Sequence, residues 1–363
     1  MGRKKEKKSK TKFLIIALIL VILGAGGALA YKIVQDKQNI EQATTPEEEN
    51  VIVEEVVEEK KVQIFQGTDR PFAVMIDNHS DAWPHAGLQK AYMIYEIIVE
   101  GGETRLMALF KGVEAEKIGP VRSARHYFLD YAMENDAIYV HFGESPQAAS
   151  DLKKFRINDI DGIAEDGTTF WRVRDKYAPH NAVTSTEKLL KSAQNKKYKT
   201  TSNETSVLNY VTDEVNLEEG QGAISVTIPH SKLQTVKYEY DEENKVYKRY
   251  ARNKAQIDWD TKEPITTKNI IITYCDNYTL SDVENKGRQG LKNIGTFDGY
   301  YITNGKAIKI KCIKSARDAK TEYKDLNGNV INVNDGNTFV NICPTNAQVV
   351  IEAPVVPEPT ETT

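Results

Sequence analysis

The chain is poor in cysteine. Its three cysteines, Cys275, Cys312 and Cys343, all lie in the last quarter of the 363 residues. An odd number leaves at least one thiol unpaired, and no two are spaced like metal ligands, so the sequence predicts no disulfide framework. We expect buried thiols that pack as small hydrophobic side chains. Because no cysteine lies near the N-terminus, a lipid cannot be attached to a cysteine there.

Several catalytic signatures are also absent. The chain contains no G-x-x-x-x-G-K-[ST], G-x-G-x-x-G, H-E-x-x-H or G-x-S-x-G. The first two absences argue against nucleotide-dependent chemistry, and we expect no cofactor. Asp77, His79 and Asp81 place hard metal ligands close together, but their segment reads as a loop. Because zinc needs ligands that converge from fixed elements, the sequence predicts no metal site.

The chain as a whole has no net positive charge. The 48 Lys and Arg residues face 52 Asp and Glu residues, a formal net charge of −4. Residues 1–37 carry nine basic and two acidic side chains, so the remaining chain has a net charge of −11. A net acidic body argues against binding of a polyanion over its whole surface, and we expect no nucleic-acid partner.

One long run, 13–31 (FLIIALILVILGAGGALAY), has no charge. Its length suits a transmembrane helix, and the basic residues before it place the tail 1–12 in the cytoplasm. We therefore predict a single-pass cell-membrane protein whose later domains are extracytoplasmic. A signal peptide cleaved after Ala30 is the alternative, because Ala28-Leu29-Ala30 has the small-x-small form. The run is longer than a usual signal sequence, which favours a retained anchor.

Composition divides the rest of the chain. Segment 32–61 is an acidic stalk, with eight Glu and one Lys between residues 38 and 60. We expect a first domain at 62–205, a linker at 206–221, a second domain at 222–353 and a disordered tail at 354–363. The first domain alternates strand and helix patterns and is predicted to be α/β, or α+β, with a mixed sheet. The smaller second domain is predicted to be mainly β.

Particular elements follow from local patterns. Apolar runs predict strands at 72–76 and 137–142 and a hairpin of 92–99 with 105–111 around a Gly-Gly turn. Helices are predicted at 123–135, at 146–155 after the N-cap Ser145, and at 187–198. In the second domain strands are expected at 236–240, 246–247, 270–274, 299–303, 307–312 and 338–342. Asn304-Gly305 and Asn327-Gly328 are expected to make hairpin turns.

The segment 118–125, IGPVRSAR, is the richest in candidate functional residues. On a helix that starts at Ser123, Arg122 and Arg125 lie on the same side of the first turn. Together with free N–H groups they would bind a phosphate, pyrophosphate or carboxylate, and Arg105 would join them if the hairpin packs beside the helix. The competing interpretation is internal pairing of these arginines with Glu96, Glu100 or Asp130.

Two histidines are the main candidates for proton transfer. His141 lies near the end of the predicted strand 137–142, and His180 lies in the loop Ala178-Pro179-His180-Asn181, positions where layered folds place function. Glu100 and Asp77 are the alternative catalytic groups. Ser123 and Ser145 are more readily explained as helix caps than as nucleophiles.

Longer motifs resemble a known family. The segments RPFAVMIDN, AGLQKAYMIYE, EGGETRLMALF, KIGPVRSAR, APHNA and GNTFVNICP are similar to the YerB-like lipoprotein family, whose members are domains of unknown function. The resemblance covers most of 65–352. It implies a two-part extracytoplasmic protein of Gram-positive type bacteria and implies no activity. The matching positions are Asp77, Asn78, Glu96, Glu100, Gly101, Gly102, Arg105, Gly119, Pro120, Arg122, Ser123, Arg125, His180 and Asn181.

Three kinds of function remain open from the sequence, and a structural subunit of a secretion or division complex is the third. The first is a membrane-anchored envelope module that binds an anionic wall polymer or an envelope protein, with anion contacts from Arg105, Arg122, Ser123 and Arg125. The second is an envelope hydrolase or transferase that acts on a phosphate-bearing or glycan substrate through the same arginines. The absence of a catalytic motif favours the first, and the sequence leaves open whether the protein is an enzyme.

Overall fold

The computed structural model describes residues 32, 35, 60–281 and 283–354. The predicted cytoplasmic tail, the predicted anchor at 13–31, nearly all of the stalk and most of the C-terminal tail lie outside the described residues. In the part of the chain that is described, no helix has the length and hydropathy needed to span a membrane. The described residues from Lys60 to Pro354 form one compact unit.

The centre of this unit is one large mixed sheet. Its strand order is β20-β19-β18-β15-β22-β2-β3-β1-β4-β5, with the short β9 also paired to β19. The strands are β1 (Phe72–Asp77), β2 (Met93–Ile98), β3 (Thr104–Phe110), β4 (Ile138–His141), β5 (Asp159–Asp161), β9 (Gln221–Gly222), β15 (Asn269–Tyr274), β18 (Gly295–Thr303), β19 (Lys306–Lys314), β20 (Glu322–Asp325) and β22 (Thr338–Cys343).

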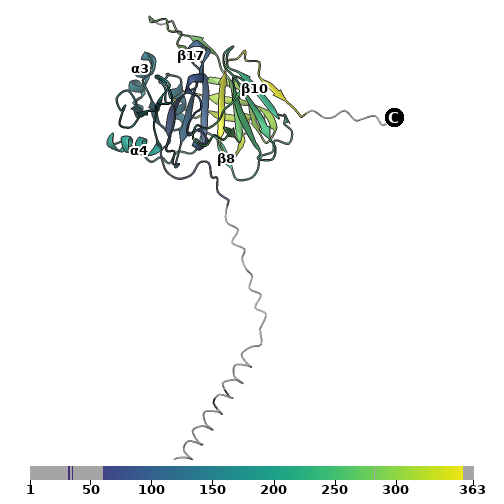
Figure 1. Cartoon of the computed structure of the whole chain (residues 1–363). Coiled ribbons are helices and arrows are strands. Elements are labelled where there is room, and N and C mark those ends of the chain that lie inside the picture. The colour runs from purple at the N-terminus through teal and green to yellow at the C-terminus, as the bar shows by residue number, and fades with distance from the viewer. Residues whose placement is uncertain (1–31, 33–34, 36–59, 282, 355–363) are drawn as a thin grey trace, which may run out of the picture. The chain divides into compact units, whose positions relative to one another are not determined.

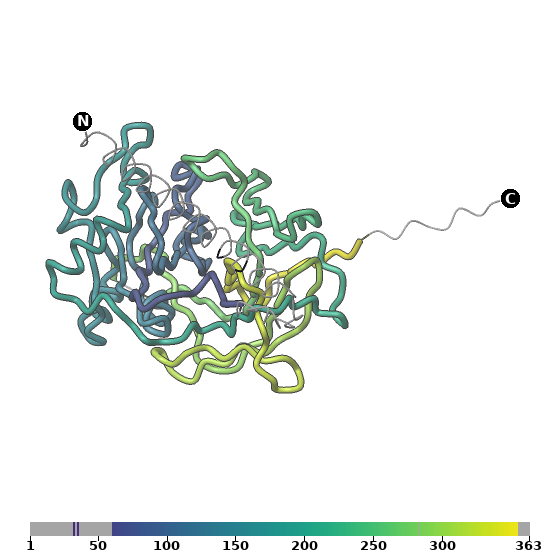
Figure 2. The backbone as a smooth tube through the Cα atoms, turned by 90° about the horizontal axis from the view of Figure 1, so that it is seen from below, coloured from purple at the N-terminus to yellow at the C-terminus, as the bar shows by residue number. Residues whose placement is uncertain are grey.

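Strands from both halves of the chain share this sheet. β2 pairs in parallel with β22, in a register that runs from Met93 opposite Thr338 to Ile97 opposite Ile342. In Figure 1 the yellow chain of β22 accordingly lies beside blue strands, and the tube in Figure 2 shows the same neighbourhood from below. The limits 62–205 and 222–353 stay a prediction, but the two parts are joined by strand pairing as well as by a linker.

A second sheet covers part of the first. It consists of β10 (Ser225–Pro229), β11 (Thr235–Asp241), β12 (Val246–Ala251), β13 (Lys254–Ala255), β14 (Thr266–Thr267) and β23 (Val350–Glu352). Figure 1 shows β10 at one side of the unit and the helices α3 (Pro146–Phe155) and α4 (Thr186–Asn195) at the other. The C-terminal region is thus mainly β, as predicted.

Successive side chains of the central strands belong alternately to two hydrophobic cores. In β1, Phe72, Val74 and Ile76 pack in one core, together with residues of the second sheet and of α4. Ala73 and Met75 point to the opposite face, where α2 (Phe128–Glu134) and α3 lie. Because successive residues of a strand face opposite sides, a strand buried on both faces reads as the continuous apolar run FAVMI.

Most predicted elements are confirmed. β2 and β3 form the antiparallel hairpin, Ser145 caps α3 by accepting from Ala148 N at 3.2 Å, and Asn304-Gly305 connects β18 and β19. The remaining short elements are η1 (Ser80–Ala82), η2 (Leu88–Lys90), η3 (Glu100–Gly102), β6 (Trp171–Arg172), β7 (Ala182–Val183), β8 (Asn209–Val211), β16 (Asn277–Thr279), β17 (Gln289–Leu291) and β21 (Asn332–Asn334).

The helix predicted at 123–135 is wrong in its first part. α2 begins only at Phe128, and Ser123 is not its N-cap. Residues 118–124 are instead extended, because they bridge neighbouring segments: Ile118 pairs with Thr184, Val121 with Ile76, and Ala124 with Glu144. These backbone partners compete successfully with the helical pattern of the local sequence.

The three cysteines are free and buried, as predicted. Burial raises the pKa of each thiol to about 12. They therefore behave as packing side chains and do not offer thiolates to a ligand.

Candidate functional site

Three parallel strands end at the same edge of the large sheet. Asp77 is the last residue of β1, His141 of β4 and Asp161 of β5, and both neighbouring pairs are parallel. The extended segment 118–124 crosses this edge. Ligand sites of layered α/β folds lie at the carboxyl ends of strands, and this edge is therefore the candidate site.

Asp77 joins two predicted site residues that are distant in sequence. Its Oδ2 lies 2.8 Å from Nδ1 of His180 and 3.1 Å from Nε of Arg122. The Asp77 side chain is only 6% exposed, whereas those of His180 and Arg122 are 17% and 27% exposed. A nearly buried carboxylate thus holds two polar groups that reach solvent.

Arg105 lies next to Asp77 in the sheet. It is opposite Asp77 of β1 and opposite Ile97 of β2, and its Nη1 donates to the carbonyl oxygen of Ser123 at 2.7 Å. Burial, followed by the nearby charge of Arg125, lowers the pKa of Arg105 to about 10, which still leaves the guanidinium charged at neutral pH. The carbonyl oxygen of Ser123 therefore helps to fix Arg105, and the predicted contact of Ser123 with an anion stays a prediction.

Arg125 forms a two-point ion pair with Glu100. Its Nε and Nη2 donate to the two carboxylate oxygens at 2.6 and 2.9 Å. Burial opposes ionisation of Glu100, but the hydrogen bonds and charge of Arg125 hold the pKa of Glu100 below its usual value. The internal pairing considered from the sequence is confirmed for this arginine, and Glu100 is held as an acceptor.

The arginine cluster itself, without Arg252, Glu103 and Asp81 of the neighbouring polar loop, has more positive than negative groups. Arg105, Arg122 and Arg125 all belong to one electrostatic neighbourhood with Asp77 and Glu100. Three guanidinium groups facing two carboxylates leave a surplus of one positive charge. Such a surplus, carried on planar groups with several N–H donors, suits a phosphate or carboxylate ligand. The helix N-terminus that the sequence predicted for this ligand is not there.

Glu96 belongs to a separate buried network behind the site. Its Oε2 accepts from Nη2 of Arg249 at 2.6 Å, and its Oε1 accepts from Thr104 at 2.7 Å. Asn78 donates to Thr104 at 2.8 Å and accepts from the indole of Trp83 at 3.1 Å. Both predicted residues, Glu96 and Asn78, are 0% exposed, so they support the site from within.

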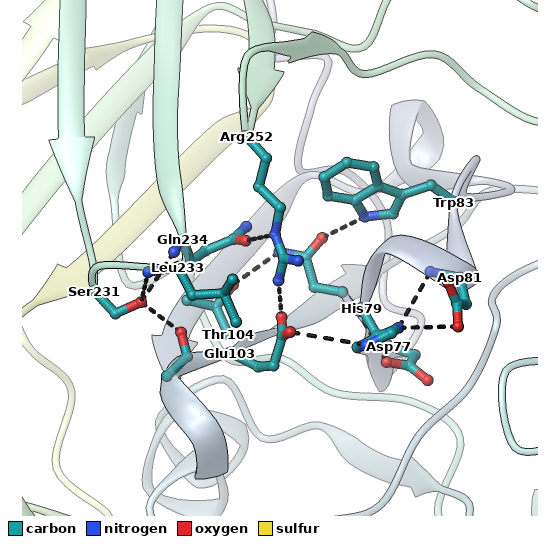
Figure 3. A network of polar contacts seen from close by, with 12 residues as sticks. Asp77, His79, Asp81, Trp83, Glu103, Thr104, Ser231, Leu233, Gln234 and Arg252 are labelled. Carbon is teal, nitrogen blue, oxygen red and sulfur yellow. Dashed lines mark hydrogen bonds and ion pairs between the residues drawn. The ribbon is translucent and has the colours of Figure 1, made fainter.

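A polar loop adds residues that the sequence did not assign. Figure 3 shows Glu103 between Arg252 and His79, with Asp81 beyond His79. The Nε2 of His79 lies 3.9 Å from Glu103, and its Nδ1 lies 3.7 Å from Asp81. The imidazole of His79 also stacks on that of His180, with ring centroids 4.8 Å apart. Glu103 and Arg252 were missed because Arg252 comes from the turn between β12 and β13, far from Glu103 in the sequence.

His141 lies in a neighbouring group of its own. Its Nε2 is 3.3 Å from Asp159, and its Nδ1 is 2.9 Å from the carbonyl oxygen of Gly143. Burial opposes protonation of the ring, but the contacts with Asp159, Gly143 and Asp161 raise the pKa of His141 above its usual value. The group borders a cavity of about 360 Å³. Among the described residues, no hydrogen bond or ion pair links His141 to the three arginines.

One other sequence candidate, Asn181, and one further aromatic residue, Trp171, lie away from the arginines. Oδ1 of Asn181 accepts a hydrogen bond from Nη1 of Arg172 at 2.9 Å. This bond connects β6 with the residue that precedes β7. Trp171 borders a cavity of about 810 Å³ together with Phe72 and Phe110. Phe72 begins β1 and Phe110 ends β3, so this cavity lies at the opposite edge of the sheet from Asp77.

Comparison with known proteins gives consistent matches. Residues 57–199 match the N-terminal domain, and residues 225–340 the C-terminal domain, of a family described as protein of unknown function (DUF3048). The chain is 31% identical over 290 residues to the putative lipoprotein YerB of Bacillus subtilis (strain 168), covering 76% of this chain and 81% of that protein. The crystal structure of YerB from Bacillus subtilis is similar with a TM-score of 0.68 and 28% identity, covering 78% of this chain and 94% of that one.

Proposed function

Because the chain belongs to the DUF3048 family, whose function is unknown, we propose its function from its own residues: it is an extracytoplasmic cell-envelope protein that binds an anionic wall polymer. The ligand group is a phosphate or carboxylate, and the binding residues are Arg105, Arg122 and Arg125. The surplus positive charge of these arginines over Asp77 and Glu100 is the observation that carries the proposal.

The envelope location is supported by sequence and relative together. The Bacillus subtilis relative is named a putative lipoprotein, which is a membrane-attached class. This chain has no cysteine before Cys275 to carry a lipid, but it has the uncharged run 13–31. In our proposal both proteins are attached at the outer face of the cell membrane. The relative would be attached by a lipid, and this chain by a retained transmembrane helix with its N-terminus in the cytoplasm.

The individual arginines suit different parts of anion binding. Arg122 is the most accessible for direct contact, because its side chain is 27% exposed and it shares Asp77 with His180. Arg125 is held in place by Glu100, and the buried Arg105 supplies charge from below. A polymer with a repeated anion could bind weakly at one such site and gain affinity from many anchored copies.

The test is binding of the full-length chain, in detergent, to Gram-positive cell walls with and without their anionic polymers. We expect binding only to walls that retain the polymer, and weaker binding as salt is raised. Arg122→Ala should lower the affinity about tenfold or more, the size expected for lost hydrogen bonds to a charged group.

Arg172→Ala is the matched control. Arg172 also pairs with an aspartate, Asp166, and its side chain is 37% exposed, but it lies on β6. The Arg172→Ala variant should bind cell walls as tightly as the wild type. Equal binding to stripped and intact walls, or equal binding by Arg122→Ala and wild type, would refute the polymer proposal and direct attention to an envelope protein as the partner.

One observation favours the second candidate, an envelope hydrolase or transferase. The contact of 2.8 Å between Asp77 and Nδ1 of His180 is the arrangement that orients a histidine for proton transfer. Turnover of polymer fragments by the wild type, abolished in His180→Gln and retained in His126→Gln, would establish this reaction. Binding without turnover would leave the module as the function.

A further inference from the structure

We propose that His79, Asp81 and His180 form a binding site for a divalent transition-metal ion, with zinc as the best fit. Each of these residues offers one ligand atom, and the three atoms lie within 4.8 Å of one another. This proposal goes beyond anion binding by the arginines, and it does not depend on it.

The position of His180 is the strongest support. The Nδ1 of His180 lies 2.8 Å from Oδ2 of Asp77, and that carboxylate is almost buried. Histidines that bind metals usually donate one ring N–H to a carboxylate, which fixes the ring and directs the other nitrogen to the ion. Asp77 is thus a positioning residue for Nε2 of His180.

The other two ligands are on a short, adjustable element. His79 precedes η1 and its Nδ1 accepts from Asp81 N at 3.2 Å. The side chains of His79 and Asp81 are 38% and 71% exposed. Zinc–nitrogen bonds of about 2.0–2.1 Å place two tetrahedral ligand atoms roughly 3.4 Å apart. The rings of His79 and His180 are stacked with 19° between their planes. The exposed His79 ring must therefore turn out of this stack, and give up its hydrogen bond from Asp81 N, to direct a lone pair to the same ion as His180.

The two arginines beside the proposed ligands are each paired with a carboxylate. Arg122 is paired with Asp77, and Arg252 is paired with Glu103. Glu103 also lies 3.9 Å from Nε2 of His79, so an additional carboxylate is at hand. Two imidazoles with a carboxylate suit zinc and related transition metals, whereas magnesium and calcium prefer oxygen ligands. A fourth position would remain for water or a substrate oxygen.

A second cluster gives an internal comparison. His141, Glu144 and Asp161 also bring ligand atoms within 4.8 Å. There, however, the buried ring of His141 already contacts Asp159 through Nε2 and the carbonyl oxygen of Gly143 through Nδ1. Both nitrogens are then used as donors, so this cluster has no free imidazole lone pair for an ion.

The test uses the purified full-length chain without an affinity tag, dialysed against ZnCl₂ and measured for bound zinc. Wild type should hold one zinc per chain, and Co²⁺ in its place should give the intense visible absorption of a four-coordinate site. His79→Ala and Asp81→Asn should each weaken zinc binding at least tenfold, and Asp77→Asn should weaken it about 10–100-fold through His180.

His126→Ala is the matched control, because His126 is a partly exposed histidine of the same half of the chain and lies outside both clusters. It should bind zinc like the wild type. Asp81 is mostly exposed, so Asp81→Asn tests the site without threatening the fold. No zinc on the wild type, or equal affinity in wild type, His79→Ala and Asp81→Asn, would overturn the proposal. No polymer is present, so this result is independent of wall binding.

Discussion

Glu96 and Arg249 form an ion pair in which both side chains are 0% exposed and the atoms Oε2 and Nη2 lie 2.6 Å apart. Glu96 is on β2 of the large sheet, and Arg249 is on β12 of the second sheet. The pair therefore connects the two sheets in the interior, directly behind the arginine site.

Arg249→Met should lower the free energy of unfolding by about 3–5 kcal/mol, because it leaves the carboxylate of Glu96 buried without its cation. Burial alone would raise the pKa of Glu96, but Arg249, His230 and Thr104 hold it below its usual value, so the carboxylate is charged in the folded protein. Urea denaturation followed by tryptophan fluorescence measures the change. Lys311→Met, which breaks the exposed pair with Asp298, should cost no more than about 1 kcal/mol.

His141→Gln should change how stability depends on pH. The folded protein raises the pKa of His141, so its contribution is fully present below the unfolded value and is lost as pH rises through the folded value. The stability gap between wild type and His141→Gln should therefore be larger at pH 6 than at pH 9 in thermal melts. His126→Gln should show the opposite trend, because burial lowers the pKa of His126. A gap that does not change with pH would contradict this role.

Asp130→Asn should remove one loss of stability that accompanies rising pH in the acidic range, so stability should rise more steeply with pH than in wild type. Burial raises the pKa of Asp130 from 3.8 to about 6, although Arg317 opposes the shift. The folded state then binds more protons between these values, so this group makes wild type lose stability as pH rises across that window. Asp151→Asn, which removes the other carboxylate bound to Arg317, should keep the slope. Identical profiles for Asp130→Asn and wild type would show that Asp130 does not titrate in this range.

Glu100→Gln should strengthen binding of the anionic polymer. The substitution removes one of the two carboxylates in the site and frees the charge of Arg125, which is otherwise paired at 2.6 Å. We expect affinity about twofold to fivefold higher at low salt, the size of one partly exposed charge. Asp166→Asn, next to Arg172, is the control and should have no effect. Weaker binding by Glu100→Gln would mean that the position of Arg125 matters more than its free charge.

Much of the fold could be predicted because its signals are local. The run FAVMI, the Gly-Gly hairpin, the Ser145-Pro146 helix start and Asn304-Gly305 each specify their structure within a few residues. The start of α2 could not be predicted, because residues before Phe128 are held extended by partners near Ile76, Glu144 and Thr184. Those partners are invisible in a local pattern.

The candidate site was predictable in part for the same reason. Arg105, Arg122, Arg125 and Asp77 were singled out by composition and resemblance, and the structure brings them together. The grouping of His79 and Asp81 with His180 required a contact across about a hundred residues. No spacing rule finds such a group, and the sequence therefore predicted no metal ligands.

The parallel pairing of β2 with β22 bears on how this family is inherited. Separated halves would each expose one long edge strand, with a row of unpaired backbone groups and apolar side chains on both faces, which is a template for aggregation. The second family match even stops at residue 340, inside β22. Recombination that exchanged one half for an unrelated domain would therefore produce an insoluble product, and the two halves should be found together, in this order, in a single gene.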